Sequence, residues 1–410
     1  MAKDSRIRIS LLLQLVFCGT LAYSFGFKST VSFTPALQAI NLKPDYPNNI
    51  ISNSGGKFGV WDGRGSDLAG IKVSLAGNSL MQPAHFDCDI LAHVVSGAAK
   101  WGMIHAEGQW VETAPLEEGD SFVIPKETTV WFYNDDVSDV SPEFAFVGFA
   151  ETSNALKDGV VTVLPVIGSK SMYLGFDDRS MGDAWALEKG TVKRLTHQQD
   201  EALFLNLKEK IYLSNPEADK VQENHVFKTK ASEPEIYVPG GGKQWSVVAS
   251  MGADYAILNS FGLGGQLILQ RPNSLYGPAY SSNSDTLIYV VKGKGHIWIV
   301  EPMKNQQILD IAFFEGQILS VPRDHGFLIV ADTDDDLEHF QVANHPAPSK
   351  TFFAGKRSPY LAIPWEILRV SFDVDDTMLD KLLHSRTYEY TLLPPYKGSV
   401  DRDSIQAAAE

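Results

Sequence analysis

Short runs of β-branched and aromatic residues, each ended by glycine or proline, recur along the chain. Thr286–Val291 leads to a Gly-Lys-Gly turn and resumes as His296–Val300, which predicts two strands joined by a tight turn. Phe122–Ile124 and Ile318–Val321 are each followed at once by proline, which cannot donate to a β-ladder. Such closely spaced strands predict a mainly β fold built as a sandwich or barrel.

A second pattern, with the spacing of helices, follows each set of strands. Pro364 is placed to occupy the first helical position before Trp365–Phe372, and Asp375 is placed to cap a second helix. That second helix carries apolar residues on one face, namely Met378, Leu379, Leu382 and Leu383. A looser pair is expected at residues 184–187 and 191–195.

The two sets of elements are copies of each other. Residues 92–97 match residues 288–293, an offset of 196, and residues 118–125 match residues 315–322, an offset of 197. One residue of slippage therefore aligns two whole units, which indicates a duplicated domain and not a short-period solenoid.

The repeat and the punctuation of the chain predict five segments. They are a signal peptide (1–24), a first unit with its helices (25–207), an exposed connector rich in proline, glycine and charge (208–243), a second unit (244–390) and a C-terminal tail (391–410).

The N-terminus has the form of a secretory signal. Lys3, Arg6 and Arg8 precede an apolar stretch at about residues 9–21, and small residues allow cleavage near Ser24. The alternative is an uncleaved membrane anchor, because the apolar stretch approaches the minimum spanning length. Cleavage predicts entry into the secretory pathway and an extracellular or vacuolar destination.

Composition excludes some partners and one kind of cross-link. The chain of 410 residues has 35 Lys plus Arg against 50 Asp plus Glu, a net charge of −15, and contains no basic tract, so nucleic acid is not expected to bind. Removal of the signal also removes Cys18 and leaves Cys88 as the single thiol, so core packing and not an intrachain disulfide must stabilise the mature chain.

The chain has a frame that resembles the cupin barrel: an apolar strand, a glycine, about twenty residues and then Glu-Gly-Asp-x-x-x-x-Pro. Two copies of this frame resemble a bicupin. Residues 288–295, 314–322, 353–358 and 363–368 are similar to legumin-type seed storage globulins. Residues 119–125, 130–134, 183–187 and 191–195 extend the likeness to short, uncleaved legumin-like and glutelin-like plant cupins. The resemblance implies two jelly-roll barrels in tandem, each followed by a short helical pair, and self-association into a homotrimer.

The resemblance also supplies a test for the stretch HFDCDILAHVVSG, residues 85–97, which is rich in potential metal ligands. Metal-binding cupins place three histidines and a glutamate at positions that fall here on Pro83, His85, Ile90 and Val130. Only His85 is retained, unless a shift of one residue brings in Asp89. The second unit has Ala279, Ser281, Thr286 and Phe327 there, with no histidine or glutamate.

We therefore expect no metal, no cofactor and no catalytic residue. If a metal does bind, the candidates are His85, Asp87 and Asp89, which share a strand face with His93 in one interpretation. The simpler interpretation is a polar loop at residues 85–89, with His93 packed in the place that Tyr289 takes in the second unit. Cys88 is not expected to be a catalytic nucleophile, because the sequence shows no group that would orient a general base beside its thiol.

Three functions follow. The resemblance implies a non-enzymatic bicupin with nutrient reservoir activity. The alternative is a cupin that binds a small ligand, a sugar or an organic acid, in an apolar barrel mouth. A metal-dependent oxidase or decarboxylase is the third.

Overall fold

The computed structural model describes residues 41–61, 66–108, 110–112, 114–137, 143–213, 220–222, 225–386 and 388–396. The segment expected to be a signal peptide lies outside these residues. No helix in the described ranges is long and apolar enough to cross a bilayer.

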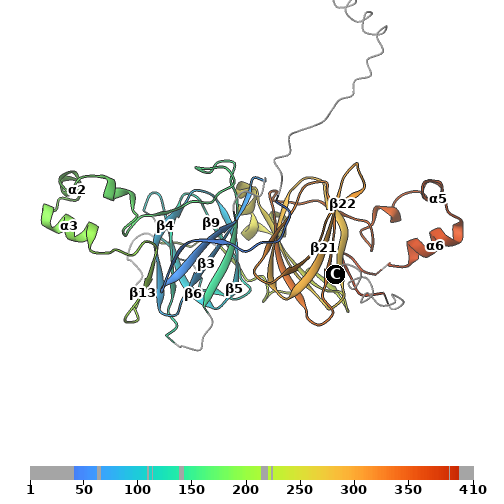
Figure 1. Ribbon diagram of the computed structural model, residues 1–410, viewed down its shortest axis with the longest axis horizontal. Coiled ribbons are helices and arrows are strands. Elements are labelled where there is room, and N and C mark those ends of the chain that lie inside the picture. The colour runs from blue at the N-terminus through green and yellow to red at the C-terminus, as the bar shows by residue number, and fades with distance from the viewer. Residues whose placement is uncertain are drawn as a thin grey trace, which may run out of the picture. The chain divides into compact units, whose positions relative to one another are not determined.

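The first unit consists of two sheets that face each other as a jelly roll, and their strand pairs are antiparallel except for β7 with β14 (Figure 1). One sheet has the order β1-β2-β3-β11-β5-β9-β15 and the other β12-β4-β10-β6-β7-β14. The strands are β1 (Asn48–Asn53), β2 (Gly56–Trp61), β3 (Leu68–Leu75), β4 (Ser79–Phe86), β5 (Ile90–Ser96), β6 (Ala98–His105), β7 (Trp110–Glu112), β8 (Leu116–Glu117), β9 (Ser121–Ile124), β10 (Thr128–Asn134), β11 (Phe144–Glu151), β12 (Val163–Pro165), β13 (Phe204–Asn206), β14 (Lys220–Gln222) and β15 (Val226–Phe227).

The second unit repeats most of this order, as β16-β17-β18-β25-β20-β23 and β26-β19-β24-β21-β22, and its described residues contain no counterpart of β15 or β14. Its strands are β16 (Ile236–Val238), β17 (Gly242–Val247), β18 (Gly264–Gln270), β19 (Leu275–Ser281), β20 (Thr286–Lys292), β21 (Lys294–Glu301), β22 (Gln306–Phe314), β23 (Ile318–Val321), β24 (Gly326–Ala331), β25 (Leu337–Ala343), β26 (Lys350–Phe352) and β27 (Leu392–Leu393). The expected duplication and the mainly β class are confirmed.

The glycine that ends the first repeated strand has the same backbone role in both units. Gly97 and Gly293 adopt positive φ angles of 69° and 86°, a region that residues with a Cβ rarely occupy. A Cβ at Gly293 would lie 2.4 Å from the carbonyl oxygen of Asp336. Glycine is therefore required at this turn, which explains its recurrence in the repeat.

Each barrel encloses an apolar core, and a third core joins the barrels. Phe58, Ile71 and Phe146 belong to the first interior, and Ile288 and Ile297 to the second. The third cluster combines residues of both units, including Leu91, Phe149, Trp245, Phe340 and Val342. The sheets that carry these residues are thus buried on both faces, and both barrels belong to one compact unit.

Helices follow each barrel and project away from it (Figure 1). They are α2 (Asp178–Trp185) and α3 (Lys189–His197) in the first unit, and α5 (Trp365–Phe372) and α6 (Asp376–His384) in the second. A shorter helix, α4 (Ile257–Phe261), precedes β18, and 3₁₀ turns lie at Met172–Gly175, Ala249–Met251, Ala253–Tyr255 and Pro359–Leu361.

The helix ends agree with the sequence except in two details. The Asp375 carboxylate accepts the amide of Met378 at 2.8 Å, which confirms the expected cap of α6. Pro364 lies one position before α5, at its N-cap, and not inside the helix. In the first unit α2 begins earlier than expected and ends at Trp185, because Ala186 takes the left-handed conformation.

The connector expected at residues 208–243 is not exposed throughout, so that part of the prediction is wrong. Val226 pairs with Phe122 of the first barrel, and Val226, Phe227, Ile236 and Val238 are all buried. Strand β27 also gives the start of the expected tail a buried place beside β19. The sequence pattern misled because prolines and charges alternate here with the few apolar residues that dock.

Candidate functional site

Asp87, a candidate metal ligand, lies in the turn between β4 and β5 and is buried. Its Oδ1 accepts the amide N–H of Thr162 at 2.7 Å, and its Oδ2 accepts that of Leu156 at 3.0 Å. The thiol of Cys88 donates to Oδ1 at 3.4 Å. Both carboxylate oxygens thus hold the loop before β12 in place through hydrogen bonds, which is a structural role.

Asp89 and His85 are engaged in the same way, each with a different segment. Asp89 Oδ1 accepts the amide of Lys126 at 2.7 Å, and burial raises the pKa of the Asp89 carboxyl. His85 Nδ1 lies 3.3 Å from the carbonyl oxygen of Thr128. The structure therefore divides the three candidates among different backbone partners, and the described residues contain no group of three His, Cys, Asp or Glu side chains arranged for a metal.

His93 is a core side chain, as the simpler interpretation expects. It pairs in register with Ser121, as Tyr289 pairs with Ile318, and its Nδ1 lies 3.1 Å from the Ser121 hydroxyl. The imidazole stacks on Phe340 of the second unit at 4.6 Å between centroids. Burial, with a smaller effect of Lys230, lowers the pKa of His93 to about 3, so the ring is neutral. Burial and the neighbouring Asp87 raise the pKa of the Cys88 thiol, which disfavours the thiolate.

Buried apolar side chains occupy four of the eight positions at which cupins hold a metal. Ile90 and Val130 are completely buried in the first barrel, and Ala279 is completely buried in the second. Phe327 is 5% exposed, and its ring packs 5.9 Å from that of Tyr276.

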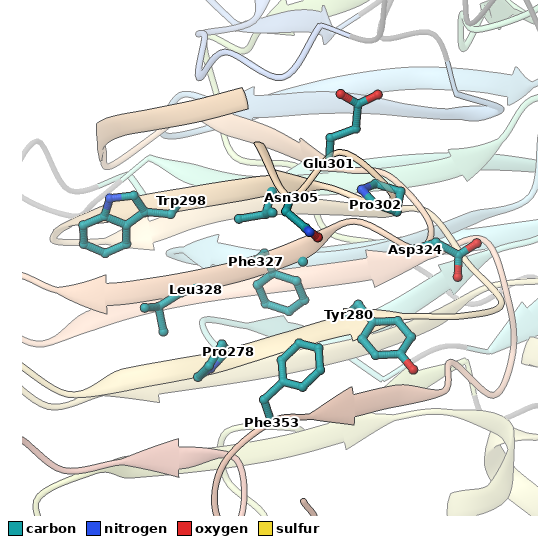
Figure 2. A pocket seen from close by; sticks show the side chains of 12 residues that line it. Pro278, Tyr280, Trp298, Glu301, Pro302, Asn305, Asp324, Phe327, Leu328 and Phe353 are labelled. Carbon is teal, nitrogen blue, oxygen red and sulfur yellow. The ribbon is translucent and has the colours of Figure 1, made fainter. Parts of the chain in front are cut away.

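A groove of about 580 Å³ lies on the outer face of β19, β21 and β24 (Figure 2). Its aromatic side chains are Tyr280, Trp298, Phe327 and Phe353, and Asp324 and Glu301 lie at its rim. Because Pro278 and Tyr280 alternate with the buried Ala279, the groove is outside the barrel and not at the barrel mouth where a small ligand was expected.

The second barrel also contains a layer of polar side chains that the sequence patterns did not predict. The Lys350 amine contacts the side-chain oxygens of Gln341 at 2.6 Å, Gln266 at 2.9 Å and Tyr276 at 3.1 Å. Gln341 Nε2 lies 3.3 Å from Nδ1 of His339, whose Nε2 lies 3.1 Å from the Gln270 oxygen. Burial lowers the pKa of His339 to about 3, so this ring is also neutral.

The first barrel has apolar residues at the corresponding positions. Strand registers place Ile71 opposite Gly148 in the first unit where Gln266 lies opposite Gln341 in the second. Likewise Leu164 lies opposite His85, as Lys350 lies opposite Ser281. Comparison of the two units in this register is the signal that would have found the polar layer.

Two jelly-roll barrels with matching strand order, each followed by a helical pair, define the protein as a tandem cupin. The cupin family model matches residues 42–172 and 232–380, and the chain belongs to that family.

Among curated proteins the chain is similar to seed globulins. It is 22% identical to conglutin alpha 1 of Lupinus angustifolius over 166 residues, which is 40% of this chain and 32% of that protein. It is 20% identical to arachin Ahy-3 of Arachis hypogaea over 454 aligned positions, with 88% of this chain and 92% of that protein covered. The chain thus spans about a third of the first of these relatives.

The fold is that of a solved storage globulin. Pumpkin seed globulin superposes with a TM-score of 0.78 and 18% identity, over 88% of this chain and all of that chain. At this identity the likeness concerns the fold alone.

Proposed function

We propose that the protein is a non-enzymatic storage-type globulin that enters the secretory pathway and accumulates in a vacuole or outside the cell. The observation that carries this proposal is the filling of the four metal positions of each barrel by apolar or otherwise non-ligating side chains, with His85 as the one exception. A barrel used as a packing unit requires an interior of this kind. The names of the relatives support the same role.

Quantitative proteomics of the source tissues tests the storage role. Accumulation to a major fraction of total protein in one storage tissue is expected, with the mature N-terminus near residue 25 and less than 0.1 equivalent of bound transition metal as an order-of-magnitude limit. Uniformly low abundance in vegetative tissue would contradict storage, and near-stoichiometric Mn, Fe or Zn would contradict the non-enzymatic role.

We also propose that the helical pairs join copies of the chain into a homotrimer. Ile367, Val370 and Met378 on α5 and α6 are 56%, 73% and 58% exposed, and Leu195 on α3 is 58% exposed. Large apolar side chains clustered on projecting helices favour burial against a partner.

Charge favours contact between unlike pairs. Helix α3 presents Lys189, Lys193 and Arg194, whereas α6 and the turn before it present Asp373, Asp375, Asp376 and Asp380, all exposed. Complementary charges favour α3 of one copy against α6 of the next, a head-to-tail contact that closes into a ring.

Light scattering at micromolar concentration tests this arrangement. The wild type is expected to be a trimer, and Lys193→Glu with Arg194→Glu is expected to be monomeric. Adding Asp376→Lys and Asp380→Lys to that variant restores the trimer, whereas Asp334→Lys with Asp335→Lys, on a distant acidic turn, leaves the wild-type trimer intact. A monomeric wild type sinks the proposal.

A second candidate function, binding of a small ligand, is favoured by the polar layer of the second barrel. The buried polar side chains Gln270, His339 and Gln341 occupy an interior that the first unit fills with apolar ones, so the fold itself does not require them. A thermal-shift screen against sugars and organic acids tests this candidate, with stabilisation that depends on Gln341 as the expected result.

A further inference from the structure

In the part of the chain that the structure describes, β22 pairs with β21 alone, so the other edge of this nine-residue strand is unpaired. Glu315 donates its amide to the carbonyl of Gly293 at the end of the β21–β22 ladder. Because hydrogen-bonded and non-hydrogen-bonded pairs alternate in an antiparallel ladder, the amides of Asp310 and Ala312 point away from β21. A long open edge of this kind is a template for a further strand.

The first barrel covers the corresponding edge with β14. Strand β7 pairs with β6 at Met103, and β22 pairs with β21 at Ile299, which lies 196 residues further along the repeat. Strand β14 pairs in parallel with the outer side of β7. The duplicate therefore shows how this fold closes the edge at which β22 is unpaired.

In both units the chain approaches this edge from the same place. Leu80 of β4 lies opposite β13, and its counterpart Tyr276 of β19 lies opposite β27, again 196 residues further on. After β13, residues 207–219 lead to β14. After β27 come residues 394–410, so the chain contains a segment long enough for the same connection and strand.

A segment from outside the second barrel already extends its other sheet. In the first unit β15 pairs with β9 at Ser121. At the corresponding residue of β23, Ile318, this place is taken by Asp45, and their amides and carbonyls pair at N···O distances of 3.3 and 3.0 Å. Asp45 precedes the first barrel in the sequence, so the second barrel uses flanking chain where the first uses a strand of the connector.

We propose that residues 397–410 of the C-terminal tail add a strand to the free edge of β22, parallel to it, as β14 does to β7. The part assigned to the pairing is residues 404–406, Ser-Ile-Gln. It has the same pattern as residues 220–222 of β14, Lys-Val-Gln, in which a β-branched residue is followed by glutamine. β-Branched residues favour strands.

The distance across the sheet is within reach of the tail. Five strand spacings of about 4.8 Å, about 24 Å in total, separate β27 from the position beyond β22. Ten extended residues, 394–403, reach about 33 Å, so residue 404 can lie beside β22. The added strand accepts the outward amides of Asp310 and Ala312 and keeps β22 from pairing with β22 of another copy.

Cross-linking with a short bismaleimide, which tolerates a register shift of one residue, tests the pairing in the full chain with Cys18→Ser. Ala312→Cys with Ile405→Cys is expected to link within one chain, because neighbouring strands bring their Cβ atoms to about 5 Å. Ser282→Cys with Ile405→Cys is the matched control, since Ser282 is exposed in the loop after β19, beside which β27 lies. Cys88 is buried and takes part in neither pair. Equal rates for the two pairs, or links between two chains only, would overturn the proposal.

Hydrogen exchange of residues 306–314 measures the same contact without a cross-link. The amides of Asp310 and Ala312 are expected to exchange at least about tenfold more slowly in the full chain than in a chain that ends at Tyr396, because the deletion removes their acceptors. Slow exchange in both chains would mean that another copy or another segment covers the edge, and the proposal would fail.

Proline variants of the full chain locate the added strand. Ile405→Pro with Gln406→Pro removes the donor whichever of the two amides faces β22, so exchange at Ala312 should become as fast as in the shortened chain. Ser399→Pro with Val400→Pro, in the crossing segment, should leave the exchange slow. The opposite pattern, or no change with either pair, contradicts the assignment of residues 404–406.

Light scattering tests whether the tail protects the edge from other copies. The chain that ends at Tyr396 is expected to associate beyond the size of the full chain. Ala312→Lys in that shortened chain should prevent the additional association, because a lysine on an edge strand opposes pairing with a second edge, whereas Ala312→Val should not. A shortened chain that keeps the size of the full chain would refute the protective role.

Discussion

Replacement of Asp87 by alanine is expected to destabilise the first barrel strongly. The carboxylate accepts two backbone amides, from Leu156 and Thr162, at 3.0 and 2.7 Å, and the residue is 3% exposed. Removing it leaves the amide N–H groups of Leu156 and Thr162, in the loop before β12, without their acceptor.

The magnitude follows from the number of bonds and their charge. A hydrogen bond to an ionised group contributes about 1.5–3 kcal/mol, so the loss of two costs about 3 kcal/mol after partial relaxation of the loop. In a unit of this size about 1 kcal/mol lowers the melting temperature by about 2–4 °C, which gives an expected decrease of about 6–12 °C. Asp87→Asn keeps one acceptor oxygen and should lose about half as much.

Differential scanning calorimetry with and without EDTA measures the effect. Asp158→Ala, an exposed aspartate in the segment that Asp87 holds, is the matched control and should melt within about 1 °C of the wild type. If EDTA lowers the melting temperature of the wild type but not that of Asp87→Ala, Asp87 binds a metal. If Asp87→Ala lowers the melting temperature by less than about 2 °C, the reasoning from hydrogen bonds is refuted.

Three further effects are expected from buried charges and titratable groups. Because His93 is neutral in the folded state down to a pKa of about 3 but has a pKa of 6.5 when unfolded, it removes stability as pH falls through that window, and His93→Phe should resist acid unfolding better in pH-dependent melts. Burial lowers the pKa of Lys350 to about 7, so its contribution to the free energy of unfolding rises by up to about 5 kcal/mol between pH 7 and 10.5. The difference in unfolding free energy between wild type and Lys350→Met, measured in urea, should change by this amount over the same pH range. Lys230 pairs with the buried Glu338 at 2.9 Å across the two units, so Lys230→Met should cost about 2 kcal/mol of stability. The double variant Lys230→Met with Glu338→Leu should recover most of that loss, whereas additive losses from the two substitutions would contradict the pairing.

Much of the fold was accessible from local patterns. The limits of α5 follow from proline before Trp365 and from the apolar spacing up to Phe372, and the cap of α6 follows from Asp375. Such signals act within one turn of helix, so they do not depend on the rest of the chain. The connector was misjudged because its docking strands β15 and β16 are only two and three residues long, too short for a periodic pattern.

For the candidate site, the sequence supported only the expectation that no metal binds there. Spacing within the cupin frame placed Ile90 and Phe327 at ligand positions and so argued against a metal. It could not place the carboxylate of Asp87, because the amides that it accepts lie about seventy residues further along the chain. Long-range hydrogen bonds of this kind have no local sequence signature.

The sequence alone was enough for the succession of strands and turns along the chain and for its duplication, since turns, proline stops and glycine at positive φ are local requirements that occur twice. Which face of each strand lies inside a barrel depends on the tertiary structure. In β18, Leu267 and Leu269 lie on one face, and Gln266, Ile268 and Gln270 lie on the other, so the glutamines by themselves suggest that this second face is the outer one. Here the leucines pack toward the other barrel while the glutamines face into their own. Alternation of residue types along a strand shows that the two faces of the strand differ. Whether both faces are buried depends on where the second barrel docks.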